Sequence, residues 1–116
     1  MARRGAGSNC FDNKDLARWY DEYQQCFFCN KTNATDFHHN IPRANIYTSV
    51  TINAVPLCRK CHEHDGTYNH KEQQRLFFKR IVIWLCERGY TFTQADRYYL
   101  LEYSDIFNPV LQELNS

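Results

Sequence analysis

The first regular pattern of apolar residues lies near the N-terminus, where they recur at i, i+3, i+4 and i+7 with charged residues between them. This spacing places them along one stripe of an amphipathic helix. It predicts a helix over residues 12–25, preceded by a flexible arm over residues 1–11. The stripe consists of Leu16, Trp19, Tyr20 and Tyr23.

The C-terminal part, residues 67–116, shows helical patterns and predicts a helical extension. A long helix from about residue 70 should end just before Gly89, which stands where a left-handed residue closes a helix. Thr93 and Asp96 have the spacing of a capping box and predict the start of a second helix. Pro109 can open a last short helix. The apolar face of the long helix consists of Leu76, Phe77, Ile81, Trp84 and Leu85.

The middle of the chain predicts short strands joined by turns. Residues 35–39 predict a strand with Phe37 as its buried residue, and Pro42 prevents its continuation. Residues 45–50 are rich in β-branched side chains and predict a second strand or an ordered loop. A short helix should begin near Cys58. Strands in the middle and helices on both sides predict an α+β domain.

Length and composition limit the number of domains and the kind of protein that the chain can form. At 116 residues the chain is long enough for one domain with a real core, so we expect a single domain over residues 1–116. The chain has no apolar run long enough to span a bilayer and no apolar segment after its N-terminal arginines. These features predict a cytoplasmic protein without a membrane partner, in a bacterial host if the chain is phage-encoded.

The charge distribution adds one point. The formal net charge is only +1, but residues 37–88 carry eight Lys or Arg against four Asp or Glu. A mildly basic centre fits a partner that bears phosphate groups, and it fits ordinary solvated surface equally well.

Four of the six cysteines form two Cys-x-x-C pairs, separated by the 28 residues from 30 to 57. This pattern favours a tetrahedral zinc site with four sulfur ligands over disulfide bonds, which are rare in the cytoplasm. Such a site has no open position, so we expect its zinc to be structural. Cys86 lies in an apolar helical run and should be buried, and Cys10 has no assignable role. The predicted zinc ligands are Cys26, Cys29, Cys58 and Cys61.

Three histidines accompany the cysteine pairs. His38 and His39 are adjacent on the predicted strand, and His62 directly follows the last predicted zinc ligand. Successive residues of a helix diverge by ~100°, so Cys61 can face the zinc while His62 faces the strand. A second, open metal site can therefore form beside the closed one.

The order of these motifs resembles the HNH endonucleases of the ββα-metal type, in particular the small four-cysteine members, many of them from bacteriophages. The resemblance covers residues 26–66, which would form the ββα-metal core with its zinc. It depends on the two Cys-x-x-C pairs, the F-H-H-N-I-P element at residues 37–42, the asparagine four residues before Leu57, and Cys61-His62.

The resemblance implies a role for each residue. His39 would be the general base that deprotonates the attacking water, while His38 and His62 would bind a catalytic divalent metal. Asn53 would tie down a loop and help to orient the base. An unperturbed imidazole has a pKa of ~6.5 and suits general-base chemistry at neutral pH. The implied activity is hydrolysis of DNA phosphodiester bonds, by nicking or double-strand cleavage, with 5′-phosphate products.

The chain departs from the family pattern at two positions. His38 stands where many members carry aspartate, so Mn²⁺, Ni²⁺ or Zn²⁺ could compete with Mg²⁺ as the catalytic metal. Gly66 stands one turn after His62, where many members have a further ligand. The candidates to replace that ligand are His64, Asp65 and His70.

The adjacent histidines also create a geometric conflict. In a regular strand the side chains of His38 and His39 point to opposite faces. Both can approach one phosphate only if the backbone leaves strand geometry there. We therefore expect a bulge or the end of the strand at residues 38–40, and a straight ladder would contradict the two-histidine assignment.

DNA is the expected partner, and Arg43 and Arg59 are the better candidates for phosphate contacts because they lie within the motif. The basic residues of the long helix fit a DNA track or a solvated face equally well. Two other functions stay open: a zinc-stapled nucleic-acid-binding module without catalysis, and a phage structural or accessory protein. A homodimer, or a complex with phage packaging or host proteins, is also compatible with the chain. The basic residues of the long helix are Lys71, Arg75, Lys79 and Arg80.

Overall fold

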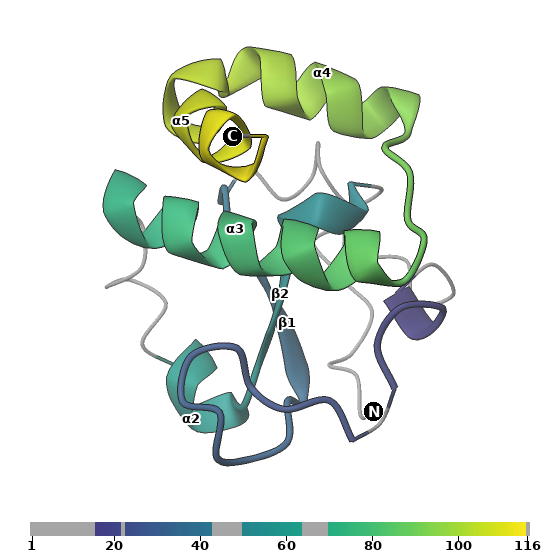
Figure 1. The fold of residues 1–116 in the computed structure, drawn as a ribbon. Helices are drawn as coiled ribbons and strands as arrows, with labels where there is room; N and C mark the ends of the chain where they lie inside the picture. Colours follow the sequence, from purple (N-terminus) through teal and green to yellow (C-terminus); the bar gives the residue numbers. More distant parts are fainter. Residues whose placement is uncertain (1–15, 22, 43–49, 64–69, 116) are drawn as a thin grey trace.

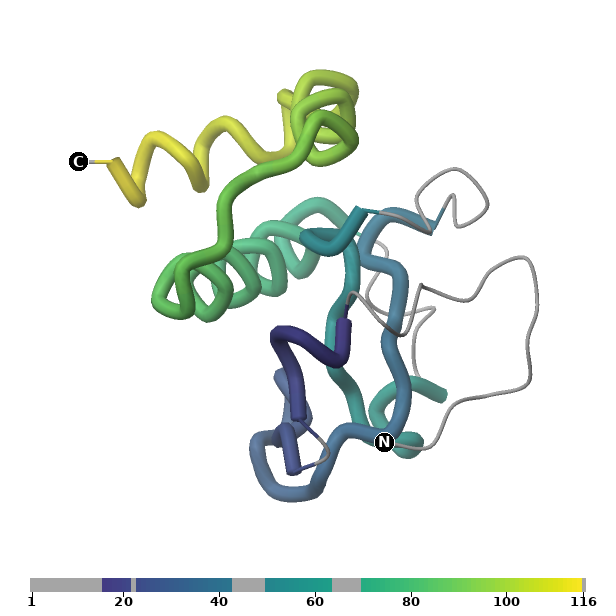
Figure 2. Tube along the Cα trace, turned by 90° about the vertical axis from the view of Figure 1, so that its right-hand side faces the viewer, coloured from purple at the N-terminus to yellow at the C-terminus, as the bar shows by residue number. Residues whose placement is uncertain are grey.

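The structure, a computed structural model, describes residues 16–21, 23–42, 50–63 and 70–115. Its helices and its small two-stranded sheet confirm the α+β class (Figure 1). Helix α3 packs against β2 and η1, and α4 and α5 form a further layer beyond it (Figure 2). The elements in chain order are β1 (Asp36–His39), the 3-10 turn η1 (Thr51–Asn53), β2 (Ala54–Leu57), α2 (Arg59–His62), α3 (Lys71–Glu87), α4 (Gln94–Glu102) and α5 (Ser104–Leu114).

The prediction of a helix over residues 12–25 is wrong for most of those residues that the structure describes. In the described part, Leu16 and Ala17 are helical, and the Tyr20 N–H donates to the Leu16 carbonyl at 2.9 Å in the last turn. The carboxylate of Asp21 then accepts a hydrogen bond from the backbone N–H of Tyr23 at 2.8 Å. This local bond offers the backbone an alternative to the helix and turns the chain. Tyr23 consequently points to solvent and is 70% exposed.

Strand β1 confirms the strand predicted before Pro42, but the face that it buries is the opposite of the predicted one. Asp36 and His38 are buried, whereas Phe37 is only partly buried. Its partner is β2, which the sequence did not predict because it contains Pro56. The sheet pairs Phe37 with Pro56 in antiparallel register. The Pro56 carbonyl accepts from Phe27 N–H at 2.8 Å on the side away from β1, so the missing N–H of Pro56 costs the ladder nothing.

Helix α3 confirms the predicted long helix and its end. Gly89 has a φ of +86°, and Tyr90 N–H donates to the Leu85 carbonyl at 3.0 Å, which closes the helix as a left-handed cap does. Two residues face differently from the prediction: Leu76 is 57% exposed, and Cys86 is exposed rather than buried. The buried face of α3 consists of Gln74, Phe77, Phe78, Ile81, Val82 and Leu85.

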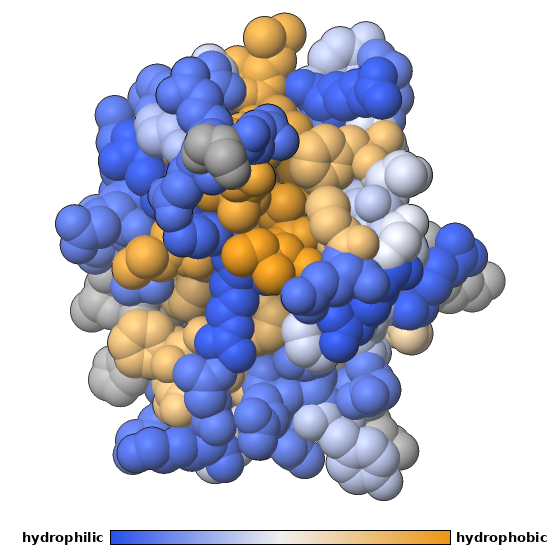
Figure 3. Space-filling model, in the orientation of Figure 1, coloured by the Kyte–Doolittle hydropathy of each residue, from blue (hydrophilic) through white to orange (hydrophobic). Residues whose placement is uncertain are grey.

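The core surrounds α3, which packs against the sheet and η1 on one side and against the C-terminal helices on the other. Tyr99, Phe78 and Phe107 are its largest fully buried side chains, and the rings of Phe78 and Phe107 stack with centroids 4.2 Å apart. A groove of about 360 Å³ with apolar lining from Leu76 and Val110 stays open between α3 and α5. Figure 3 shows apolar side chains gathered on this face. No helix in the described ranges combines the length and hydropathy needed to cross a bilayer.

The last two helices begin differently from each other. Helix α4 starts with the predicted capping box, in which Thr93 and Asp96 exchange side chain–backbone hydrogen bonds. Helix α5 starts at Ser104, five residues before Pro109, where the sequence predicted its first turn. A proline inside a helix leaves the carbonyl four residues earlier without its usual donor. Here that carbonyl, of Asp105, accepts from Arg75 Nη2 at 3.1 Å, and the Ile106 carbonyl accepts from Arg75 Nε at 2.8 Å.

Replacing Arg75 by Met should therefore lower the free energy of unfolding by about 1–3 kcal/mol, because two helix carbonyls lose a charged donor. Lys79→Met is the matched control on the same helix. It removes an ion pair with Glu113 in which both side chains are well exposed, and should cost about 0–1 kcal/mol. Urea denaturation of the two variants measures the difference. Equal losses would contradict the role given to Arg75.

Candidate functional site

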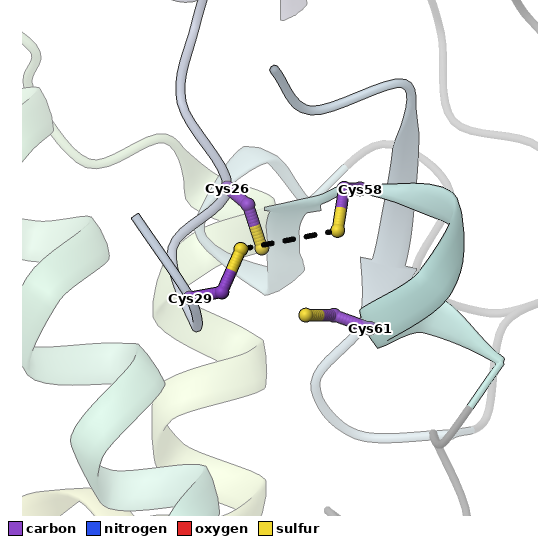
Figure 4. A group of neighbouring side chains, drawn as sticks. All are labelled: Cys26, Cys29, Cys58 and Cys61. Atoms are coloured by element: carbon purple, nitrogen blue, oxygen red, sulfur yellow. Dashed lines mark hydrogen bonds between the residues drawn. The ribbon is translucent and has the colours of Figure 1, made fainter. Parts of the chain in front are cut away.

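The four cysteines of the two Cys-x-x-C pairs converge on one point. Their Sγ atoms all lie within 4.8 Å of one another, and the side chains point inward from opposite sides (Figure 4). Cys26 and Cys29 come from the turn before β1, whereas Cys58 caps α2 and Cys61 lies within it. Sulfur ligands at ~2.3 Å from a tetrahedral ion are ~3.8 Å apart, and the Cys29 and Cys58 sulfurs are 4.0 Å apart. The cluster could hold a structural metal such as zinc.

Backbone groups build the turn that carries the first pair. Asn30 N–H donates to the Cys26 carbonyl at 3.0 Å, and Phe28 N–H donates to Cys26 Sγ at 3.4 Å. Asn30 itself has a φ of 59°, a left-handed conformation that asparagine tolerates better than most residues. Such N–H groups aimed at sulfur stabilise thiolates, the form that binds metal.

The thiols ionise unequally. Hydrogen bonds from the Lys31 backbone and the Thr32 side chain lower the pKa of Cys29 to about 6. Burial opposes ionisation of Cys58, but hydrogen bonds from Thr32 and Cys61 outweigh it and lower its pKa. Burial raises the pKa of Cys61. A divalent cation would supply the attraction that the last thiol needs to ionise.

His38 and His62 lie together beside this cluster. His38 is 3% exposed on β1, and its ring centroid is 5.6 Å from that of His62 on α2. His38 also contacts Phe77 of α3, with ring centroids 6.2 Å apart. The sequence therefore predicted this pair correctly as neighbours, although their role as metal ligands stays a prediction.

The spacing of the two rings fits a shared cation. An imidazole nitrogen binds a divalent metal at ~2.1 Å, so two rings sharing one ion have centroids ~5–6 Å apart. Nδ1 of His62 is engaged with the carboxylate of Asp36, which leaves Nε2 as the nitrogen able to bind a metal. The two imidazoles could thus hold one ion. Within the described ranges, however, only the cysteines bring three or more ligand atoms within 4.8 Å of one another.

His39 occupies the end of β1. The ladder pairs His38 with Val55 and His39 with Ala54 in regular register, so the expected bulge is wrong, while the expected strand end is confirmed. The straight ladder at these residues counts against both histidines reaching one phosphate, because their side chains leave the strand on opposite faces. Desolvation and, to a smaller extent, the electrostatic effect of His62 together lower the pKa of His39 to about 4, so these two imidazoles lie within electrostatic reach.

This pKa has a consequence for stability. Because His39 takes up its proton near pH 4 when folded and near ~6.5 when unfolded, the unfolded chain binds more protons between these values. The free energy of unfolding should therefore fall as the pH drops from about 6.5 to about 4. Urea denaturation across this range should show a shallower fall for His39→Gln than for the wild type. Identical slopes would contradict the depressed pKa.

Asn53 is fully buried and fastens the loop after β1. Its Oδ1 accepts from Ile41 N–H at 2.8 Å and from the Tyr99 hydroxyl at 2.7 Å, while its Nδ2 donates to the Ile41 carbonyl at 3.3 Å. This is the loop-fastening geometry expected of Asn53, with an added tie to α4. Its part in orienting a base stays a prediction.

The basic residues divide into two groups. Arg59 is 59% exposed and lies beside the histidines, with Nε 3.4 Å from Asp36 Oδ2. The cations of α3 are instead engaged within the molecule. Besides Arg75, Lys71 pairs with Asp105, Lys79 pairs with Glu113, and Arg80 donates to the Phe27 carbonyl at 2.8 Å. These contacts favour an internal structural role for α3 over a DNA track.

Several candidate residues lie outside the described ranges or have another role. Arg43, His64, Asp65 and Gly66 are outside, as is the strand or loop predicted at residues 45–50. His70, a candidate third ligand, caps α3 by accepting from Gln73 N–H at 3.3 Å. It does not join the histidine pair.

Asp36 is the site residue that the sequence analysis missed. It is 3% exposed and accepts a hydrogen bond at 2.9 Å from Nδ1 of His62. A signal was present, because Asp36 precedes His38 by two residues and side chains at i and i+2 of a strand share a face.

Comparisons of the chain with protein-family models, with curated proteins and with solved structures find no match. What the protein does must therefore be inferred from its own residues.

Proposed function

We propose that this chain is a metal-dependent endonuclease of the HNH type, with a structural zinc at its four cysteines. The observation that carries the proposal is the pair of imidazoles, His38 and His62, beside the cysteine cluster. His39 leaves β1 on the opposite face, so its role as the base requires the phosphate to be approached around the end of the strand. The succession of β1, β2 and α2 supports a ββα-metal core, since Cys58 and Cys61 hold α2 at the end of β2.

The residues would divide the chemistry of phosphodiester hydrolysis among them. His39, neutral at pH 7, would take a proton from the attacking water, and an approaching phosphate anion would raise its pKa towards its ordinary value. His38 and His62 would hold the divalent metal. When bound, that metal would supply positive charge at the departing 3′ oxygen. The products would be a 5′-phosphate and a 3′-hydroxyl.

The expected substrate is DNA, and Arg59 is the described cation best placed to contact its phosphates, because most of its side chain is exposed beside the site. A single active site cuts one strand at a time, so nicking is the expected outcome for a monomer.

The test is conversion of supercoiled plasmid by protein that retains one equivalent of zinc but has been dialysed free of loosely bound metal. Nicked circles should form only after Mg²⁺, Mn²⁺ or Ni²⁺ is added, and DNA ligase should reseal them because the ends are 5′-phosphate and 3′-hydroxyl. Absence of nicking with every metal would refute the nuclease proposal. Plasmid binding without cleavage would then favour the zinc-stapled binding module.

A further inference from the structure

A buried carboxylate joins the strand of the histidines to the helix that carries His62. Asp36 is the first residue of β1, opposite Leu57, and its side chain is 1% exposed. Its Oδ2 lies 2.9 Å from His62 Nδ1 and 3.4 Å from Arg59 Nε. One carboxylate oxygen therefore faces two side chains of α2.

The hydrogen bond determines where the proton of a neutral His62 ring resides. An ionised carboxylate can only accept hydrogen bonds, so the nitrogen facing it must carry the proton. Nδ1 is that nitrogen, which leaves the lone pair on Nε2 at the far side of the ring. A metal ion binds the unprotonated nitrogen, and carboxylates often orient metal-binding histidines through the other nitrogen.

The same contact fixes the direction of the ring. His62 is the last residue of α2, a helix of four residues, and 22% of its side chain is exposed. A partly exposed side chain at a helix end would otherwise sample several rotamers. The bond to a buried, immobile strand residue restricts these rotamers and holds the ring near that of His38.

We propose that Asp36 is a positioning residue: it holds His62 as the Nδ1–H tautomer, so that Nε2 is presented to a divalent cation shared with His38. The proposal deepens the proposed function and rests on it for the identity of the ligand. Arg59 offsets part of the charge of the buried carboxylate. A purely structural tie between β1 and α2 would need the same Nδ1–H tautomer but would give Asp36 no influence on metal binding, so the affinity for added metal separates the two roles.

The first measurement is the ¹⁵N spectrum of the His62 ring in the zinc-loaded protein at mildly alkaline pH, without added metal. The wild type should show a protonated Nδ1 and an unprotonated Nε2. Asp36→Asn keeps the size of the side chain but offers a weaker acceptor and an N–H₂ donor. The His62 signals should then shift towards the opposite tautomer, while Asp105→Asn, the same change at an exposed site, should leave them unaltered.

The second measurement is calorimetric binding of Mn²⁺ or Ni²⁺ to the same proteins. Asp36→Asn should weaken binding by ~10–100-fold, with one zinc equivalent retained, and Asp105→Asn should not. A wild-type ring protonated at Nε2 would overturn the proposal even if the variant failed to fold. Unchanged tautomer and metal affinity in a folded Asp36→Asn protein would do the same.

Neither measurement depends on nuclease activity, so the two hypotheses can fail separately. A correct tautomer and metal affinity in a protein that never nicks DNA would refute the proposed function alone. Nicking by a protein with the opposite tautomer would refute the positioning role alone.

Discussion

Replacing Cys58 by serine should release the metal of the cysteine cluster and destabilise the end of the molecule that carries α2. Structural zinc contributes on the order of 10 kcal/mol of apparent binding free energy in small zinc domains, and that energy is also folding energy. Contacts away from the cysteines, such as the stacked rings of Phe78 and Phe107, also stabilise the core, so the net loss of stability should be smaller, about 4 kcal/mol or more. Metal analysis after dialysis and thermal unfolding measure both effects.

Cys86→Ser is the matched control, because Cys86 is an exposed thiol of α3 outside the cluster. It should retain one equivalent of zinc and unfold at the wild-type temperature. Hydrogen exchange should locate the damage in Cys58→Ser to the turn at residues 26–30 and to α2, leaving α3 protected. A Cys58→Ser protein that lost its zinc and kept a fully protected α2 would contradict the structural role of the metal.

Replacing His39 by alanine should lower the rate of plasmid nicking by ~10²–10⁴-fold at saturating metal, the usual contribution of a general base. Metal affinity should change little, because His38 and His62 are the proposed ligands. His38→Ala should instead weaken metal binding, and a higher metal concentration should restore part of its rate. Initial rates over a series of Mn²⁺ concentrations distinguish the two effects.

His70→Asn is the control for this experiment. His70 caps α3 through a side-chain acceptor, and asparagine can serve as a cap in the same place. Its nicking rate should equal that of the wild type. Equal rates for His39→Ala and the wild type would exclude His39 as the base. The reason would be that the His39 side chain leaves β1 on the face opposite to His38.

Features set by neighbouring residues could be predicted from the sequence. The capping box of Thr93 and Asp96, the left-handed Gly89 and the two Cys-x-x-C pairs each depend on a few residues along the chain. The neighbouring positions of His38 and His62 followed from the adjacency of Cys61 and His62, because a helix that turns Cys61 towards the cluster turns His62 towards the strand.

Features set by distant residues could not be predicted. Strand β2 tolerates Pro56 because the proline N faces away from β1, which depends on the place of the strand in the sheet. Helix α5 runs through Pro109 because Arg75, some 30 residues earlier, binds the carbonyls near the break. The spacing of Asp36 and His38 indicated a shared strand face, but the bond from Asp36 to His62 depends on the packing of α2 against β1.

The brevity of α2 makes the position of His62 depend on the cysteine cluster. Four residues are too few to form a stable helix alone, so α2 depends on the anchoring of Cys58 and Cys61. His62 directly follows Cys61, so the position of the His62 imidazole depends on the position of Cys61. Zinc in the cysteine cluster would therefore define the position of His62 together with the contacts from Asp36 to Arg59 and His62. We expect a chain synthesised under zinc starvation to keep the three histidines but to hold His62 less firmly.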